Sequence, residues 1–225
     1  MTFSLVGRCA RTGMFGVAIT TSSICVGARC PHARARAGAV ATQNVTDPVF
    51  GPLILGYLAD GLSAGAALRR ATAERSFLDY RQITVVDRNG ETACHSGTRI
   101  LGKHAEQAGR DCFAAGNLLK SEAVPEAMVR RFEAEAGAHL APRLLAALEA
   151  GLAAGGEAGP VHSAALLVVH EHPFPLVDLR CDWDDDDPVA TLRNLWTAYE
   201  PQMEAYVARA VAPAAAPSYG VSGDP

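Results

Sequence analysis

The spacing of apolar positions changes along the chain, and the earliest pattern is that of short strands. Apolar runs at 3–8 and 14–21 flank the turn-forming Arg11-Thr12-Gly13, so we expect these two strands to form a hairpin. The segment 22–32 between this hairpin and the next apolar run is small and polar, and is expected to be irregular. Further strands are predicted at 39–43, 83–87, 92–95, 111–115, 163–169 and 176–181.

Apolar residues at helical spacing follow these strands in pairs. Asp47-Pro48 and Ser63 are start signals for a first pair of helices, because Asp and Ser cap helices and Pro suits the first helical position. Two more helices follow residue 117, and the second carries a leucine stripe over 140–152 that stops at Gly155-Gly156. Asp187-Pro188 predicts the start of one long final helix that runs past Tyr206.

The order of these elements indicates the fold class. Hairpin-linked strands alternate with pairs of helices, which favours an α+β fold of antiparallel sheets covered by helices over an alternating parallel sheet. No change in composition marks a boundary, so we expect one domain over residues 1–212. Pro, Ala, Gly and Ser dominate residues 213–225, which predicts a flexible or surface-draped tail.

Composition narrows the range of partners. The 225 residues carry a net charge of −4, which gives no basic surface for nucleic acid. No apolar run is long enough to cross a bilayer, so no membrane contact is expected. The six cysteines include no CxxC pair, and reduced thiols in a cytoplasm fit best. No phosphate-binding loop or dinucleotide fingerprint is present, and no cofactor is expected.

Thr2 is the candidate nucleophile, because it stands directly behind the initiator methionine. Removal of Met1 would leave Thr2 with a free α-amine, whose pKa of about 7.7–8.0 lets it accept a proton from the neighbouring hydroxyl. The strand that follows would hold this residue at the end of a sheet. Loss of Met1 without any catalytic consequence is the simpler alternative.

Several strand ends carry polar groups suited to a site. His95-Ser96-Gly97 ends one predicted strand, Gly116-Asn117 ends another, and Thr42-Gln43 ends a third. Asn117 has an amide that can donate to a developing oxyanion, and His95 is either a general acid–base or a simple hydrogen-bond partner beneath a turn.

Two other clusters favour structural interpretations. His170-Glu171-His172 would place two imidazoles on one side of a strand as metal ligands, but an exposed polar turn before Pro173 is the better interpretation. Asp184 to Asp187 are four carboxylates that a hard cation could bind. Because the run leads into a helix N-terminus, we interpret it as a helix start.

An ordered set of short motifs, spread over residues 2 to about 206, resembles the domain of unknown function 1028 family. The motifs are Thr2-Phe3-Ser4, Thr12-Gly13, Gly16-Val17-Ala18, Val26-Gly27-Ala28, Gly38-Ala39-Val40-Ala41-Thr42-Gln43, His95-Ser96-Gly97, Ala115-Gly116-Asn117-Leu118-Leu119 and Val177-Asp178-Leu179-Arg180. The family is grouped with the N-terminal nucleophile (Ntn) hydrolases. The resemblance therefore implies a four-layer αββα sandwich of two antiparallel sheets.

The resemblance also implies amide-bond hydrolysis without a metal, on a small amide or peptide-like substrate. In that mechanism Thr2 is the nucleophile. From their chemistry and their positions in the motifs, and not from roles known in the family, we take Asn117 and His95 as further candidate catalytic residues and Thr42, Gln43 and Ser96 as candidate pocket residues. Arg180 either holds a substrate carboxylate or pairs with Asp178. Lys103 is the first lysine, so residues 1–102 offer no helper lysine.

Related folds assemble often, and we expect a homo-oligomer. A non-catalytic module that binds a ligand or serves assembly with the same fold is the alternative function. The third candidate function is that of a metal-dependent hydrolase using His170 and His172.

Overall fold

The computed structural model describes residues 2–223, which form a mixed α+β fold with two antiparallel sheets. This confirms the coarse fold class predicted from the order of the elements. The strands are β1 (Thr2–Arg8), β2 (Phe15–Thr21), β3 (Pro31–Arg34), β4 (Gly38–Asn44), β5 (Arg81–Asp87), β6 (Thr92–Ser96), β7 (Ala105–Gly109), β8 (Cys112–Asn117), β9 (Ser163–Val169) and β10 (Val177–Cys181). The α-helices are α1 (Phe50–Ala59), α2 (Ala64–Ala73), α3 (Val124–Ala134), α4 (Leu140–Ala153), α5 (Pro188–Tyr199) and α6 (Met203–Val211).

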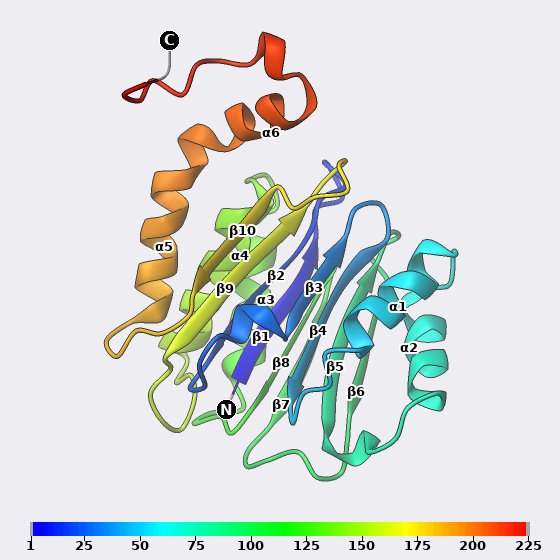
Figure 1. The fold of residues 1–225 in the computed structure, drawn as a ribbon. Helices are drawn as coiled ribbons and strands as arrows, with labels where there is room; N and C mark the ends of the chain where they lie inside the picture. The colour runs from blue at the N-terminus through cyan, green and yellow to red at the C-terminus, as the bar shows by residue number, and fades with distance from the viewer. Residues whose placement is uncertain (1, 224–225) are drawn as a thin grey trace.

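Strand β1 lies in the interior of the larger sheet. The six-stranded sheet has the order β10-β9-β2-β1-β8-β7, and the four-stranded sheet has the order β3-β4-β5-β6 (Figure 1). In the register of β1, Thr2 is opposite Thr21 of β2 on one side and Asn117 of β8 on the other. The first residue of β1 is therefore fixed between two neighbouring strands.

Alternate residues of β1 pack on opposite sides of the sheet. Phe3 and Leu5 belong to a core shared with α3, α4 and α5, whereas Val6 belongs to a cluster shared with Ala39 and Ala41 of the smaller sheet. Since side chains alternate along a strand, Thr2 and Ser4 face the second sheet with Val6. The space between the sheets thus receives the polar residues at the start of β1.

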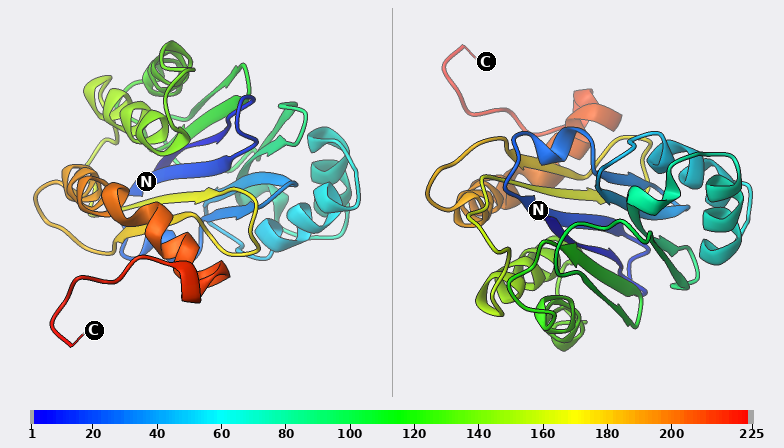
Figure 2. Two further views of the ribbon diagram at one scale, coloured as in Figure 1. Left: turned by 90° about the horizontal axis from the view of Figure 1, so that it is seen from above. Right: turned by 90° about the horizontal axis from the view of Figure 1, so that it is seen from below.

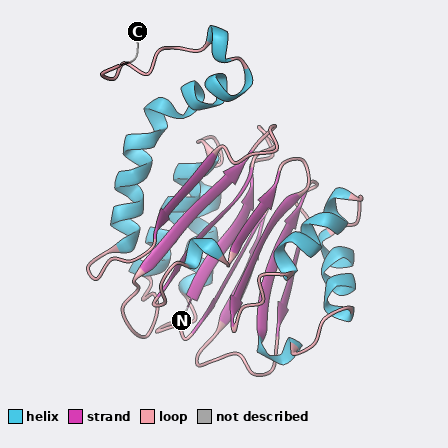
Figure 3. Cartoon of the chain, viewed as in Figure 1, coloured by secondary structure: helices cyan, strands magenta, loops and turns pink. Residues whose placement is uncertain are grey.

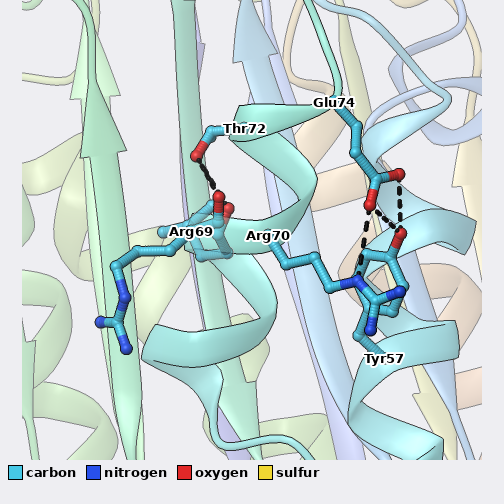
Figure 4. Close-up of polar contacts among 6 residues, drawn as sticks. Tyr57, Arg69, Arg70, Thr72 and Glu74 are labelled. Carbon is cyan, nitrogen blue, oxygen red and sulfur yellow. Dashed lines mark hydrogen bonds and ion pairs between the residues drawn. The ribbon is translucent and has the colours of Figure 1, made fainter.

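Pairs of helices cover the outward faces of both sheets. Helices α1 and α2 pack with Val40, Ile83 and Val85 of the smaller sheet, and α3 and α4 lie on the far side of the larger one (Figures 2 and 3). Polar contacts join α1 to α2 on their exposed side. There the Tyr57 hydroxyl donates to Glu74, and the Arg70 guanidinium lies 4.4 Å from the Tyr57 ring centre (Figure 4).

Some elements differ from the sequence prediction. Strand β3 falls at the end of the segment predicted to be irregular, and β7 is an additional edge strand with a largely exposed, weakly apolar sequence. The predicted final helix is wrong as a single element. A 3-10 turn over Glu200–Gln202 separates α5 from α6, because Pro201 has no N–H for the helical ladder.

Two predicted helix caps are confirmed, and one start is later than expected. Ser63 accepts a hydrogen bond from the Ala66 N–H, and Asp187 accepts bonds from the N–H groups of Val189 and Ala190. The first helix begins at Phe50, so Asp47-Pro48 lies in a turn before it. Asp47 Oδ1 accepts from the Val49 N–H there.

Beyond α6 the described chain runs along the outside of the molecule, and residues 213–223 are largely exposed (Figure 1). Within residues 2–223, no helix has the length and apolarity that a bilayer crossing requires.

Candidate active site

Thr2 is buried at the start of β1, with 6% of its surface exposed. Its Oγ1 lies 3.0 Å from Thr21 Oγ1, and either hydroxyl can donate in this contact. Thr21 Oγ1 also lies 3.3 Å from Ser23 Oγ. The candidate nucleophile therefore has a hydrogen-bonding neighbour on one side and Asn117, its register partner, on the other.

A network of side-chain hydrogen bonds joins the two sheets beside Thr2. Ser4 Oγ donates to Gln43 Oε1 at 2.7 Å, and Gln43 Nε2 donates to Gln82 Oε1 at 2.7 Å. Asn117 Nδ2 donates to the same Gln82 oxygen at 3.2 Å. These four polar residues are 2% exposed or less. Since buried polar groups are costly unless they are bonded, this network fixes the relative position of the sheets at the Thr2 end.

Asn117 keeps unused bonding capacity within this network. Its Oδ1 is buried and has no hydrogen-bond partner in the part of the chain that the structure describes. Only one of its two Nδ2 hydrogens is needed for the bond to Gln82. Asn117 can therefore offer both a donor and an acceptor to a group beside Thr2.

Ser96 connects the network to the edge strands. Gln82 Nε2 donates to Ser96 Oγ at 3.4 Å, and Ser96 Oγ donates to Glu106 Oε2 at 2.8 Å. The Cys94 thiol donates to the same carboxylate oxygen, and burial raises the pKa of this thiol well above its usual range. Cys94 is thus held as a neutral thiol.

The structure places His95 and Thr42 on the opposite face of the smaller sheet. His95 alternates with Cys94 and Ser96, and its Nε2 lies 3.0 Å from the carbonyl oxygen of Leu78 in a turn outside the sheet. Thr42 alternates with Gln43 and bonds Thr46 Oγ1 at 2.6 Å. The network beside Thr2 brings together Gln43, Ser96 and Asn117, but neither His95 nor Thr42.

Arg180 lies on the edge strand β10, three strands from β1. At a spacing of about 4.8 Å per strand it is about 14 Å from β1 across the sheet. Its Nε and Nη2 donate to the two carboxylate oxygens of Asp178 at 2.8 and 2.9 Å. In this structure Arg180 is therefore paired with Asp178.

Glu157 is a site residue that the sequence prediction missed. It is 5% exposed, and neither carboxylate oxygen has a hydrogen bond of good geometry among the described residues. Burial raises the pKa of this carboxyl to about 8, although Ser22 lies close enough to act in the opposite direction and lower the pKa. It also contributes to the lining of a cavity of about 250 Å³. A single Glu in the loop between α4 and β9 gives no pattern by which to find it.

The loop that carries Glu157 is anchored near the start of β1. Glu157 forms a bridge with Leu119, and the Ala158 N–H donates to the Leu118 carbonyl at 2.9 Å. These partners directly follow Asn117, the last residue of β8 in register with β1. A Cβ on Gly156 would lie 3.8 Å from the Phe3 ring. The buried carboxyl is therefore a neighbour of the Thr2 end of β1.

The remaining clusters keep structural contacts. His170 Nε2 lies 2.9 Å from the Thr12 carbonyl oxygen, and His172 stacks on Phe174 at 5.1 Å. Among residues 2–223, no group of three or more His, Cys, Asp or Glu side chains is arranged to hold a metal ion. In the acidic run, Asp184 Oδ1 accepts from the N–H groups of Asp186 and Asp187 ahead of α5.

The fold and the buried polar network define a mixed α+β protein with a candidate site between two antiparallel sheets. The chain belongs to the family of unknown function DUF1028, whose model matches residues 2–192. This confirms the family indicated by the sequence motifs.

A solved structure of the same family supports this assignment. Protein SPO2555 from Silicibacter pomeroyi is 32% identical, with 88% of each chain covered and a TM-score of 0.81. No match was found among proteins with curated descriptions.

Two more distant structures were also found. Anbu (ancestral beta-subunit) from Yersinia bercovieri is 10% identical, with 90% of this chain and 96% of that chain covered and a TM-score of 0.39. Anbu from Hyphomicrobium sp. strain MC1 is also 10% identical, with 97% and 100% covered and a TM-score of 0.38.

Proposed function

We propose that this protein hydrolyses an amide bond in a small amide or peptide-like compound, with Thr2 as the nucleophile after Met1 has been removed. The observation that carries the proposal is the position of Thr2. It is buried between the sheets at the start of an interior strand, 3.0 Å from Thr21 Oγ1 and opposite Asn117. The pairs of helices outside both sheets are consistent with the αββα sandwich of Ntn hydrolases.

In the proposed reaction, Thr2 Oγ1 attacks the carbonyl carbon of the substrate while its proton passes to the Thr2 α-amine. The carbonyl oxygen becomes an oxyanion, for which the second Nδ2 hydrogen of Asn117 is the candidate donor. The bond from carbon to nitrogen then breaks, and the amine leaves with the proton from the α-ammonium. Water hydrolyses the resulting ester and regenerates the threonine.

Glu157 has a candidate role as a positioning residue for the α-amine. Its carboxyl has a pKa of about 8, which is close to that of an N-terminal amine at about 7.7–8.0. A carboxyl with a raised pKa is largely neutral near pH 7 and can form a hydrogen bond with a neighbouring amine. Unlike the positive charge of a helper lysine, an ionised carboxyl would favour the protonated amine, so the candidate role of Glu157 is to hold the amine in place. Lys103, the first lysine of the chain, instead donates from Nζ to the Lys120 carbonyl at 3.4 Å.

The test begins with the mass of the purified protein, which should correspond to loss of Met1. A panel of small amides with chromogenic leaving groups is then assayed with the native protein, with Thr2→Ala and with Thr2→Ser. We expect Thr2→Ala to reduce kcat by at least 1,000-fold, in line with the loss of a nucleophile, and Thr2→Ser to retain part of the activity. Thr12→Ala, in the turn at the other end of β1, is the matched control and should leave kcat unchanged.

A covalent probe gives a second readout. A β-lactone should acylate the native protein at Thr2, as seen by a mass increase on the N-terminal peptide, and should not modify Thr2→Ala. Retention of Met1 in the active protein, or full activity of Thr2→Ala, would contradict the proposed mechanism. The same preparation tests the expected homo-oligomer by light scattering.

A non-catalytic ligand-binding role is the second candidate. The observation in its favour is that Thr2 Oγ1 already has Thr21 Oγ1 within hydrogen-bonding distance and that Thr2 is almost fully buried. This role predicts that ligands stabilise Thr2→Ala as well as they stabilise the native protein.

A further inference from the structure

A second cavity lies at the end of the larger sheet opposite to Thr2. Its volume is about 320 Å³, and its charged lining residues are Arg8, Arg11, Arg110, Asp111, Glu133 and Arg143. Arg8 is the last residue of β1, and a strand of seven residues spans about 20 Å. The cavity is therefore separate from the candidate active site.

Arg143 is the most unusual residue of this cavity, because it is 4% exposed and its buried guanidinium forms no ion pair with a described carboxylate. The neighbours that favour its charge are Cys9, Cys112 and Asp111. Its Nε and Nη2 donate to the Phe132 carbonyl at 3.3 and 3.2 Å, and the guanidinium lies 4.0 Å from the Phe132 ring centre. A guanidinium has five N–H donors, so the Phe132 carbonyl and the nearby Cys9 thiol still leave some of them available.

A buried arginine of this kind is costly. Arginine is almost never fully buried unless it is paired, and an isolated buried charge is strongly unfavourable. Arg143 also lies in the first turn of α4, where the positive end of the helix dipole opposes a cation. Burial correspondingly lowers the pKa of Arg143. A negative charge in the cavity would relieve both effects.

The other lining residues add positive charge. Four guanidinium groups face two carboxylates, and these carboxylates already have partners. Asp111 accepts from Arg8 Nη1 at 2.5 Å, and Glu133 accepts from the Arg110 backbone N–H at 2.6 Å. Arg8 Nε is buried and has no acceptor among the described residues. The cavity thus keeps an excess of donors and of positive charge.

We propose that this cavity binds a small oxyanion, a phosphate or carboxylate group, with Arg143 as its buried contact and Arg11 and Arg110 at its rim. The planar fork of a guanidinium matches the oxygens of both groups in bidentate contacts. A volume of about 320 Å³ lies within the range of small-ligand sites. The site would bind its ligand whether or not Thr2 is catalytic.

Titration calorimetry and thermal unfolding with inorganic phosphate and with malonate, each against sodium chloride at equal ionic strength, test the proposal. We expect saturable binding of at least one oxyanion and a rise in Tm. Arg11→Ser combined with Arg110→Ser should weaken binding at least tenfold, and both residues are exposed, so folding should be kept. Arg69→Ser combined with Arg70→Ser removes the same charge on α2, outside the other sheet, and should change affinity less than twofold.

Arg143→Lys tests the buried contact, because it keeps the positive charge but loses the planar guanidinium that makes two parallel hydrogen bonds. We expect this variant to lose at least tenfold in oxyanion affinity. If Arg143→Lys does not fold, the affinity of Arg11→Ser is measured in its place. Response to phosphate alone, or to malonate alone, would identify the group that the cavity prefers. The proposal would be overturned if neither phosphate nor malonate showed saturable binding. It would also be overturned if the two double variants weakened binding equally.

Discussion

Ser4 Oγ donates a 2.7 Å hydrogen bond to Gln43 Oε1, and this bond crosses from the larger sheet to the smaller one. Both residues are buried, so the bond is not in competition with water. It fixes which residues of β4 lie opposite those of β1, and hence the position of Thr2 relative to the second sheet.

Replacement of Gln43 by leucine should destabilise the fold by about 1–3 kcal/mol, because it removes the acceptor for Ser4 and the donor to Gln82 and leaves buried groups unpaired. Urea unfolding measures the change. Gln107→Leu, on the exposed edge strand β7, is the control and should shift stability by less than about 0.5 kcal/mol. Equal effects of the two substitutions would show that the inter-sheet network contributes nothing.

Glu157 should make stability depend on pH between about 4.3, its ordinary pKa, and about 8. The folded state holds the proton more tightly than the unfolded state, so stability should be highest below this window and fall as pH rises through it. Above about pH 8 this contribution should level off. Urea unfolding at pH 5, 6.5 and 8 should show that the free energy of unfolding of the native protein falls as pH rises, and that it falls less in Glu157→Gln. Glu149→Gln, which removes an exposed ion pair with Arg193, should show the same pH dependence as the native protein.

Two glycines of α1 should respond in opposite directions to alanine. A Cβ at Gly51 would lie 2.1 Å from the ring carbon Cγ of His32, whereas a Cβ at Gly56 would meet nothing within 4 Å. We expect Gly51→Ala to cost about 1–3 kcal/mol through overpacking. Gly56→Ala should stabilise by up to about 1 kcal/mol through helix propensity. Thermal unfolding of both variants decides this, and stabilisation by Gly51→Ala would mean that His32 moves freely.

The acidic run should behave as a helix cap and not as a cation site. Asp187→Ala removes the acceptor for two N–H groups of α5 and should cost about 1 kcal/mol. Asp186→Ala, one residue earlier, should cost less than about 0.5 kcal/mol. Millimolar Ca²⁺ should not alter the unfolding midpoint of the native protein. A calcium-dependent rise that Asp184→Ala abolishes would support the cation interpretation instead.

The sequence was sufficient for the fold class and for part of the site. Hairpins and helix caps are local features, so Ser63 and Asp187 were identified from their neighbours alone. Gln43, Ser96 and Asn117 were selected because they end strands, and the structure brings them together. The adjacent residues Thr42 and His95 ended the same strands but face the other way, and no isolated strand reveals which face will meet the second sheet.

Other parts of the site required three-dimensional information. Ser4 lies within a predicted apolar strand and Gln82 directly precedes another, and a polar residue in either place becomes meaningful only when its hydrogen-bond partners in the folded protein are known. Glu157 lies in a loop whose pairing with Leu119 spans 38 residues of sequence. Pro201 was a local signal for the break between α5 and α6, and the continuous apolar stripe through Met203 masked it.

The interior position of β1 has a consequence for maturation. The proposed mechanism requires that Met1 be removed. Since β1 is held by neighbours on both sides, an aminopeptidase would have little access once the sheet has closed, so this removal would have to occur while the chain is still leaving the ribosome. Under the proposed mechanism, an N-terminal fusion would occupy the α-amine of Thr2 and so block the reaction. Fusions are better placed after α6, which lies far from that strand's beginning (Figure 1).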